Sequence, residues 1–138
     1  MSPKTDLVAK WYVAISSRDW DTLRAITDPA IDFTVADGFP AGGKYQGKDA
    51  VFDDFFPRSF QEWSQFTTEV DEIIEAQEHN VVTVRGRYVG RTLRTNTSFD
   101  VPFAHIWRVG EGHQLIWLQQ YADTAVMRDA ILGAPTEP

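Results

Sequence analysis

A histidine among large apolar side chains is the most informative chemical group in this sequence. Strict alternation along residues 98–109 places His105 on one strand face with Phe99, Val101, Phe103 and Trp107. An imidazole in that setting is either a core histidine with satisfied hydrogen bonds or an acid or base in an active site. The segment therefore predicts one titratable group in an apolar pocket.

A carboxylate at the end of a predicted strand is the second candidate. Asp37 follows the alternating segment 31–36 and opens a stretch, 37–47, that holds four glycines and one proline. At a pocket rim, such a carboxylate gains a raised pKa and can move a proton between two carbons of an enolisable ketone. The alternative is a turn-forming Asp-Gly pair. Asp123 is a further candidate acid, although capping of a C-terminal helix explains it more simply.

Side chains on neighbouring segments are candidates for the wall of the pocket. Trp117, Gln119 and Tyr121 alternate along the segment 114–122, and Tyr88 lies on the predicted strand 81–94. The expected contacts with a substrate, drawn from one helix and three strands, are Phe56, Tyr88, Phe103, Trp117, Gln119 and Tyr121.

Apolar periodicity predicts helices in the first half of the chain and strands mainly in the second, as in an α+β domain. The predicted helices cover 5–17, 19–28, a third from Lys48 that Pro57 kinks or ends, and 123–132 at the C-terminus. The predicted strands cover 31–36, 66–77, 81–94, 98–109 and 114–122. Residues 1–138 are thus predicted to form one domain, in which a cone-shaped, curved antiparallel sheet and three helices close an apolar pocket.

Composition excludes several classes of function. The net charge of −7 argues against a nucleic-acid partner, and the absence of cysteine excludes disulfides and thiolate chemistry. The three histidines lack metal-site spacing, and His79 and His113 lie in predicted turns exposed to solvent. No apolar run suits a membrane span or a signal peptide. We expect a cytoplasmic protein without metal or cofactor.

Local motifs resemble those of the nuclear transport factor 2-like superfamily, which includes ketosteroid isomerases and SnoaL-like polyketide cyclases. Residues 12–14 (YVA), 19–21 (DWD) and 34–37 (TVAD) resemble the N-terminal half of a ketosteroid isomerase, with one inserted residue near Pro29. Residues 46–51 (QGKDAV) resemble the start of the third helix in that family. Residues 101–109 (VPFAHIWRV) and 120–125 (QYADTA) resemble SnoaL-like proteins.

The resemblance implies roles for three residues. Tyr12 stands at the position of the isomerase phenol, which donates a hydrogen bond to the enolate oxygen. Asp37 stands at the position of the general base. His105 stands where the isomerase has its second donor, a protonated carboxylic acid, so the chain departs from the isomerase pattern there.

Two hypotheses follow from these residues. The first is an enzyme that transfers a proton next to the carbonyl of a small hydrophobic ketone, as an isomerase or a cyclase does. The second is a small-ligand-binding or dimerisation module without catalysis, because this fold serves both. Family architecture implies a homodimer through the outer sheet face. Arg85, Arg87 and Arg91 share that face, where they either contact a second copy or pair with acids such as Glu69 and Asp71.

Overall fold

The computed structural model describes residues 2–76, 78 and 80–133. None of the helices in these ranges has the length and hydropathy to cross a membrane. In chain order the elements are α1 (Pro3–Ser17), α2 (Trp20–Ala25), β1 (Thr27–Val35), β2 (Gly43–Gln46), the π-helix η1 (Ala50–Phe55), α3 (Phe56–Ser59), the 3₁₀-helix η2 (Phe60–Glu62), β3 (Trp63–Ala76), β4 (Val81–Thr92), β5 (Ser98–Val109), β6 (Leu115–Ala122) and α4 (Thr124–Leu132).

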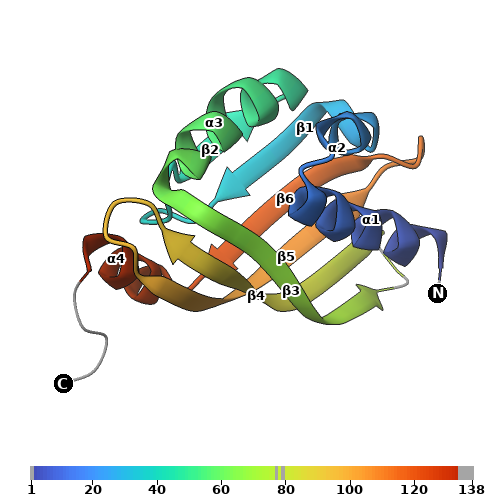
Figure 1. The fold of residues 1–138 in the computed structure, drawn as a ribbon. Helices are drawn as coiled ribbons and strands as arrows, with labels where there is room; N and C mark the ends of the chain where they lie inside the picture. The colour runs from blue at the N-terminus through green and yellow to red at the C-terminus, as the bar shows by residue number, and fades with distance from the viewer. Residues whose placement is uncertain (1, 77, 79, 134–138) are drawn as a thin grey trace.

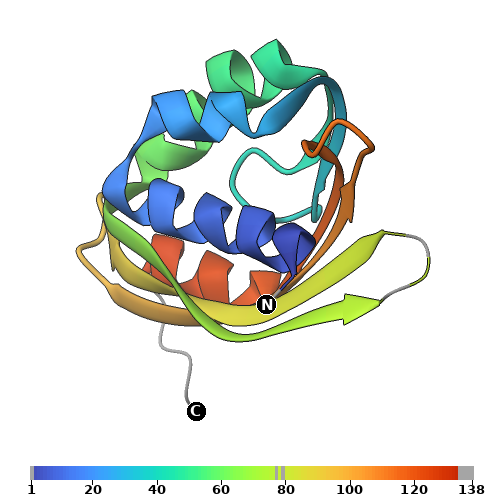
Figure 2. The same ribbon diagram turned by 90° about the vertical axis from the view of Figure 1, so that its right-hand side faces the viewer.

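The strands form one curved sheet in the order β2-β1-β6-β5-β4-β3. Figure 1 shows α4 at the opposite end of this sheet from the N-terminus, and Figure 2 shows α1 along the concave side. The predicted α+β class, with a curved sheet that helices cover, is confirmed. Four of the pairings are antiparallel, as predicted, but β1 pairs with β6 in parallel, so the sheet is mixed.

Helix α1 positions one side of the core. Ser2 and Thr5 form a reciprocal capping box, and Pro3 occupies the first turn, where its missing N–H costs nothing. The helix buries a broad stripe that includes Trp11 and Tyr12, and it ends where Arg18 adopts a left-handed conformation, with φ 59°. The predicted helix over 5–17 is therefore confirmed, with two further residues at its start.

The first strand is longer than the sequence predicts. Strand β1 begins at Thr27 and runs through Pro29, which was expected only to end the preceding helix. The pairing of β1 with β6 shifts between Thr27 and Asp32, and β2 pairs with β1 only from Asp32 onward. Pro29 thus lies where the ladder is irregular and needs no N–H donor. The segment 37–47, predicted to be a loop, also contains the short strand β2.

The third helical segment is irregular along its whole length. A π-helix, η1, leads into α3, where Pro57 stands in the first turn, and η2 completes the segment as a 3₁₀-helix. The predicted kink at Pro57 is thus a change between three helix types. The segment still buries Phe55 and Phe56 against the core. It closes the concave side of the sheet next to α1 and α2 (Figure 1).

Two glycines in β4 let aromatic rings of β5 lie directly on the strand. A Cβ atom at Gly86 would stand 2.8 Å from Cζ of Phe103 and 2.5 Å from the carbonyl oxygen of Glu69. A Cβ atom at Gly90 would stand 2.8 Å from Cζ of Phe99. Side chains at these positions would displace both rings, so the close contact between β4 and the aromatic core depends on glycine.

Replacing Gly86 should therefore weaken the fold. Gly86→Ala is expected to lower the free energy of unfolding by ~1–3 kcal/mol, because the methyl group overpacks the core against Phe103. Urea denaturation measures the change. Gly112→Ala is the matched control, since nothing lies within 4 Å of the Cβ atom added there. Equal stability of the two variants would contradict this account of β4.

Candidate functional site

An apolar cavity of about 40 Å³ lies between the sheet and the helices. Aromatic side chains form most of its wall, and its polar groups come from Ser59 of α3 and from the adjacent strands β3, β4, β5 and β6. The wall includes three phenylalanines and three polar side chains that determine what the site can bind, namely Phe39, Phe56, Phe66, Tyr88, His105 and Gln120. The volume suffices for about three water molecules, but a cavity that takes benzene needs roughly 150 Å³. A ring-sized ligand must therefore displace one of these side chains.

A chain of hydrogen bonds runs beneath the cavity and passes through both nitrogens of His105. The Tyr12 hydroxyl lies 2.6 Å from Nδ1, and the Tyr88 hydroxyl lies 2.6 Å from Nε2. The Trp107 indole donates to the Tyr12 oxygen over 2.8 Å, and the Gln120 amide donates to the Tyr88 oxygen over 2.9 Å. All five side chains are buried. This is a satisfied buried network on four elements, α1, β4, β5 and β6.

At each end of this series of hydrogen bonds, a group that can only donate determines the direction of the bonds. The backbone N–H of Ala36 donates to Oε1 of Gln120 over 3.0 Å. This contact fixes the Gln120 amide so that its NH₂ group faces Tyr88, and the Tyr88 oxygen must accept. At the other end, the indole N–H of Trp107 makes the Tyr12 oxygen accept as well. Each phenol therefore has one proton left to donate.

Burial keeps His105 neutral and thereby determines where those two protons go. Desolvation lowers the pKa of this imidazole to about 3, so at neutral pH one ring nitrogen donates and the other accepts. One phenol donates to His105, and the other accepts from it and keeps its own proton free. Tyr88 lines the cavity, whereas Tyr12 does not. A free proton on Tyr12 would be buried without an acceptor, so we assign the Nε2–H tautomer, in which Tyr12 donates to Nδ1.

This assignment leaves the Tyr88 hydroxyl as a hydrogen-bond donor that faces the cavity. Its oxygen accepts from His105 and from Gln120, and its proton is available to a bound ligand. Burial raises the pKa of Tyr88 well above its usual value, so the phenol remains protonated. Phe103 holds the arrangement in place, because its ring stacks on His105 at 4.1 Å and on Tyr88 at 4.4 Å between centroids.

The structure brings together five of the residues that the sequence singled out. His105, Tyr88 and Phe56 line the cavity, while Tyr12 and Phe103 support His105 from behind and beside it. Tyr12 was expected to face the substrate, as in the isomerases. Its hydroxyl is instead occupied by His105 and Trp107, so the phenol that can meet a ligand is Tyr88.

Asp37 lies outside the cavity. It is exposed in the turn that follows β1 and does not contribute to the cavity wall. The side chain that enters from this loop is Phe39, which is buried. The structure therefore places Asp37 as the turn residue of an Asp-Gly pair. Of the two groups expected to move a proton, Asp37 and His105, it is His105 that lies at the cavity.

The prediction that Trp117, Gln119 and Tyr121 line the cavity was wrong. Their strand, β6, has a register irregularity between Leu115 and Trp117, opposite Arg108 and Val109 of β5. This bulge reverses which side chains face inward, so Leu118 and Gln120 reach the cavity while Tyr121 is 53% exposed. Trp117 lies on the outer face, beneath the guanidinium of Arg108. The sequence reasoning thus missed Gln120 by a single residue.

Two other candidates have structural roles. The Asp123 carboxylate accepts from the backbone N–H of Val126 over 3.1 Å and caps α4, which confirms the simpler interpretation. His113 is exposed in a turn, as expected. His79 lies outside the described residues.

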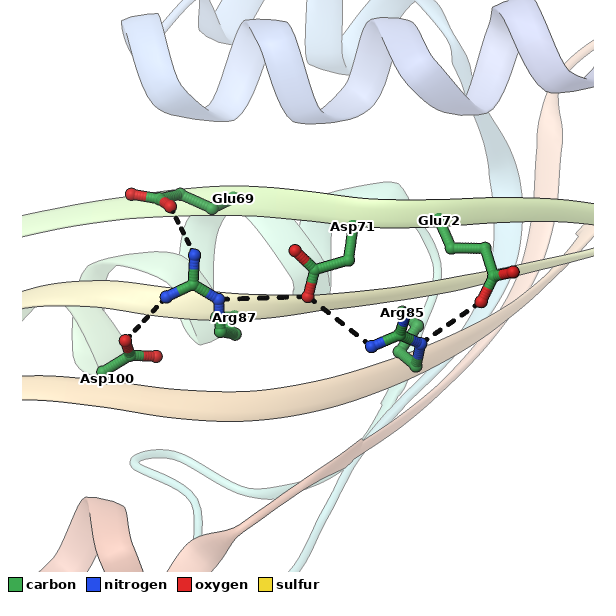
Figure 3. Close-up of polar contacts among 6 residues, drawn as sticks. All are labelled: Glu69, Asp71, Glu72, Arg85, Arg87 and Asp100. Carbon is green, nitrogen blue, oxygen red and sulfur yellow. Dashed lines mark hydrogen bonds and ion pairs between the residues drawn. The ribbon is translucent and has the colours of Figure 1, made fainter.

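Arg85 and Arg87 of β4 pair with acids on the outer face of the sheet (Figure 3), whereas Arg91 donates to the backbone carbonyl oxygen of Asn96 over 3.0 Å. Arg87 bonds Glu69 and Asp100, each over 2.6 Å, and Arg85 bonds Glu72 over 3.2 Å. Asp71 lies 3.9 Å from Arg87 and 3.7 Å from Arg85. The hydrogen bond that Arg87 donates to the Asp100 carboxylate raises the pKa of Arg87. Of the two roles left open for these arginines, pairing with acids is observed for Arg85 and Arg87.

Similarity to known proteins assigns this chain to a family. The family model described as the SnoaL-like domain matches residues 8–118, most of the chain. The chain belongs to the SnoaL-like family. No curated protein gave a match.

Solved structures agree with this membership. An NTF2-like protein from Burkholderia thailandensis E264 is 33% identical, with a TM-score of 0.83 and coverage of 95% of this chain and 98% of that chain. An NTF2-like protein of unknown function from Burkholderia pseudomallei K96243 is 26% identical, with a TM-score of 0.86 and the same coverage. TerC, co-crystallised with polyporic acid, shares the fold at 19% identity, with a TM-score of 0.84 and coverage of 95% and 99%.

The neutral state of His105 should make stability depend on pH. The unfolded chain binds a proton on this imidazole near pH 6.5, the folded chain only near pH 3, so the unfolded state binds more protons between these values. Stability is therefore expected to fall as the pH drops from 6.5 towards 3, by up to ~1.4 kcal/mol per pH unit from this group.

Urea denaturation of the wild type and of His105→Gln at pH 7 and at pH 4.5 measures this contribution. The wild type should lose more of its free energy of unfolding than the variant, because glutamine does not titrate. Identical losses in both proteins would show that folding does not lower the pKa of His105.

Proposed function

We propose that this SnoaL-like protein binds a small, flat, largely apolar carbonyl compound and promotes proton transfer next to the carbonyl by stabilising the enolate. The observation that carries the proposal is the place of the Tyr88 hydroxyl, which lines the cavity and contacts His105 and Gln120. The Nε2–H tautomer assigned to His105 leaves the Tyr88 proton free to bond a ligand oxygen. A donor fixed in an apolar site favours the charge that develops on that oxygen during enolisation.

Tyr88 is proposed to act by hydrogen bonding rather than by giving up its proton. Full transfer would draw a proton from His105 to Tyr88 and another from Tyr12 to His105. Tyr12 would then become a buried phenolate, which its strongly raised pKa disfavours. The relay therefore polarises the ligand oxygen, and the proton removed from carbon passes to a base from the solvent, either water or a buffer anion, that enters the site with the ligand.

A second candidate function, ligand binding without turnover, is favoured by the chemistry of the cavity wall. Among the described residues that line the cavity, none is an aspartate or a glutamate. A carbonyl compound bound there would be held and polarised by Tyr88 without a carboxylate to remove its proton. The co-crystallisation of TerC with polyporic acid supports small-molecule binding by this fold and applies equally to both candidates.

Loss of the Tyr88 hydroxyl should separate the two candidates. In deuterated buffer, the wild type is expected to accelerate exchange of the α-protons of 2-tetralone, as followed by proton NMR. Tyr88→Phe should reduce the protein-dependent rate by about 100-fold, since one donor to an oxyanion is removed. The matched control is Tyr121→Phe, which removes an exposed hydroxyl from the outer face.

Binding of 2-tetralone by calorimetry accompanies the exchange measurement. Binding that weakens in Tyr88→Phe, with no exchange above buffer in the wild type, would establish the binding function and refute catalysis. Exchange that is equally fast in Tyr88→Phe and in Tyr121→Phe would contradict the role of Tyr88. Circular dichroism checks that each variant is folded.

A further inference from the structure

The indole N–H of Trp63 is a buried donor without a hydrogen-bond partner. Trp63 opens β3, opposite Thr92 of β4, and only 7% of its surface is exposed. Among the described residues, its Nε1 atom is the buried side-chain nitrogen or oxygen for which no hydrogen bond is found. Proteins rarely leave a buried donor unsatisfied, and such a group in a native structure requires an explanation.

Trp63 lies across an aromatic ring from Tyr88. The Phe39 ring has its centroid 6.0 Å from that of Trp63 and 5.4 Å from that of Tyr88. Phe66 bridges the same two rings, at 5.3 Å from Trp63 and 5.2 Å from Tyr88. Both Phe39 and Phe66 belong to the cavity wall. The rings of Trp63 and Tyr88 therefore flank the same pair of rings, and Trp63 is not itself a residue of the wall.

Of these two rings, that of Phe39 belongs to a turn and not to a strand of the sheet. It lies between β1 and β2, whereas Phe66 is part of β3. Its turn contains two positions of positive φ, Gly38 at 92° and Ala41 at 63°. The observed cavity is too small for a ring, but departure of the Phe39 ring would add its volume between Trp63 and Tyr88.

We propose that the ligand of this protein takes the place of the Phe39 ring and bonds two donors, the hydroxyl of Tyr88 and the indole N–H of Trp63. Such a ligand is a flat ring compound with two oxygen acceptors, as in a dione or a quinone. The Tyr88 contact rests on the function proposed above, whereas the Trp63 contact is an additional determinant of specificity. A buried site that offers two donors discriminates strongly against a ligand with one acceptor.

The first test observes the Trp63 donor directly in the wild-type protein. In ¹⁵N-labelled protein, the indole signal of Trp63 is assigned by its loss in Trp63→Phe. Saturation with 1,4-naphthoquinone, which has two carbonyl groups, should move this proton downfield as its hydrogen bond forms. The monoketone 1-tetralone should move it much less. The chain has no cysteine that could add to the quinone.

The second test compares affinities by calorimetry. Trp63→Phe is expected to weaken binding of 1,4-naphthoquinone about tenfold and to change binding of 1-tetralone by less than about twofold. Trp117→Phe is the matched control, because Trp117 lies on the outer face of β6. Phe39→Ala should strengthen binding of both compounds, since the ligand no longer has to displace the ring.

The outcomes distinguish this inference from the proposed function. Equal loss of affinity for both compounds in Trp63→Phe, or no shift of the Trp63 signal at saturation, would overturn the second donor and leave the role of Tyr88 intact. Failure of the wild type to bind either compound would overturn the two-donor site, and 2-tetralone exchange then decides the proposed function separately. If Trp63→Phe does not fold, assignment by standard triple-resonance spectra keeps the first test decisive.

Discussion

Neutral His105 is the constraint on which the rest of the site depends. A neutral imidazole has one donor and one acceptor, so the two phenols on either side of it cannot have the same role. The backbone of Ala36 and the indole of Trp107 determine the outer ends of the chain, and the imidazole then determines its middle. Because α1, β4, β5 and β6 each contribute a side chain to it, the helix layer and the sheet are aligned by the same bonds that orient the ligand donor.

The position of His105 depends in turn on aromatic packing that only glycine permits. Phe103 stacks against both His105 and Tyr88 because the neighbouring strand has no side chain at Gly86. A larger residue at Gly86 would move the ring, and the ring would move the imidazole. The polar network and the apolar core are therefore packed as one unit, because the absence of a side chain at Gly86 makes room for the ring that supports the imidazole.

The sequence allowed prediction of the parts of the site that follow from local periodicity. Alternation along β5 correctly placed His105 inward, and resemblance to known proteins identified Tyr12 as a residue of the site. Asp37 and β6 were predicted wrongly because strand pairing decides them. Whether Asp37 faces inward depends on the turn after β1, and the inward face of β6 depends on a bulge set by β5. The parallel pairing of β1 with β6 joins segments about 80 residues apart, which no local pattern reports.

The bulge in β6 also decides which of two sets of side chains faces the cavity. Residues 115–122 contain two adjacent glutamines, and the bulge selects Gln120 rather than Gln119 as the partner of Tyr88. A slip of one residue in the pairing, which would place Trp117 rather than Leu118 opposite Trp107, would turn Trp117, Gln119 and Tyr121 inward without any substitution. The strand thus encodes two alternative pocket walls in a single sequence. The place of the extra residue in the ladder decides which of the two walls the cavity receives.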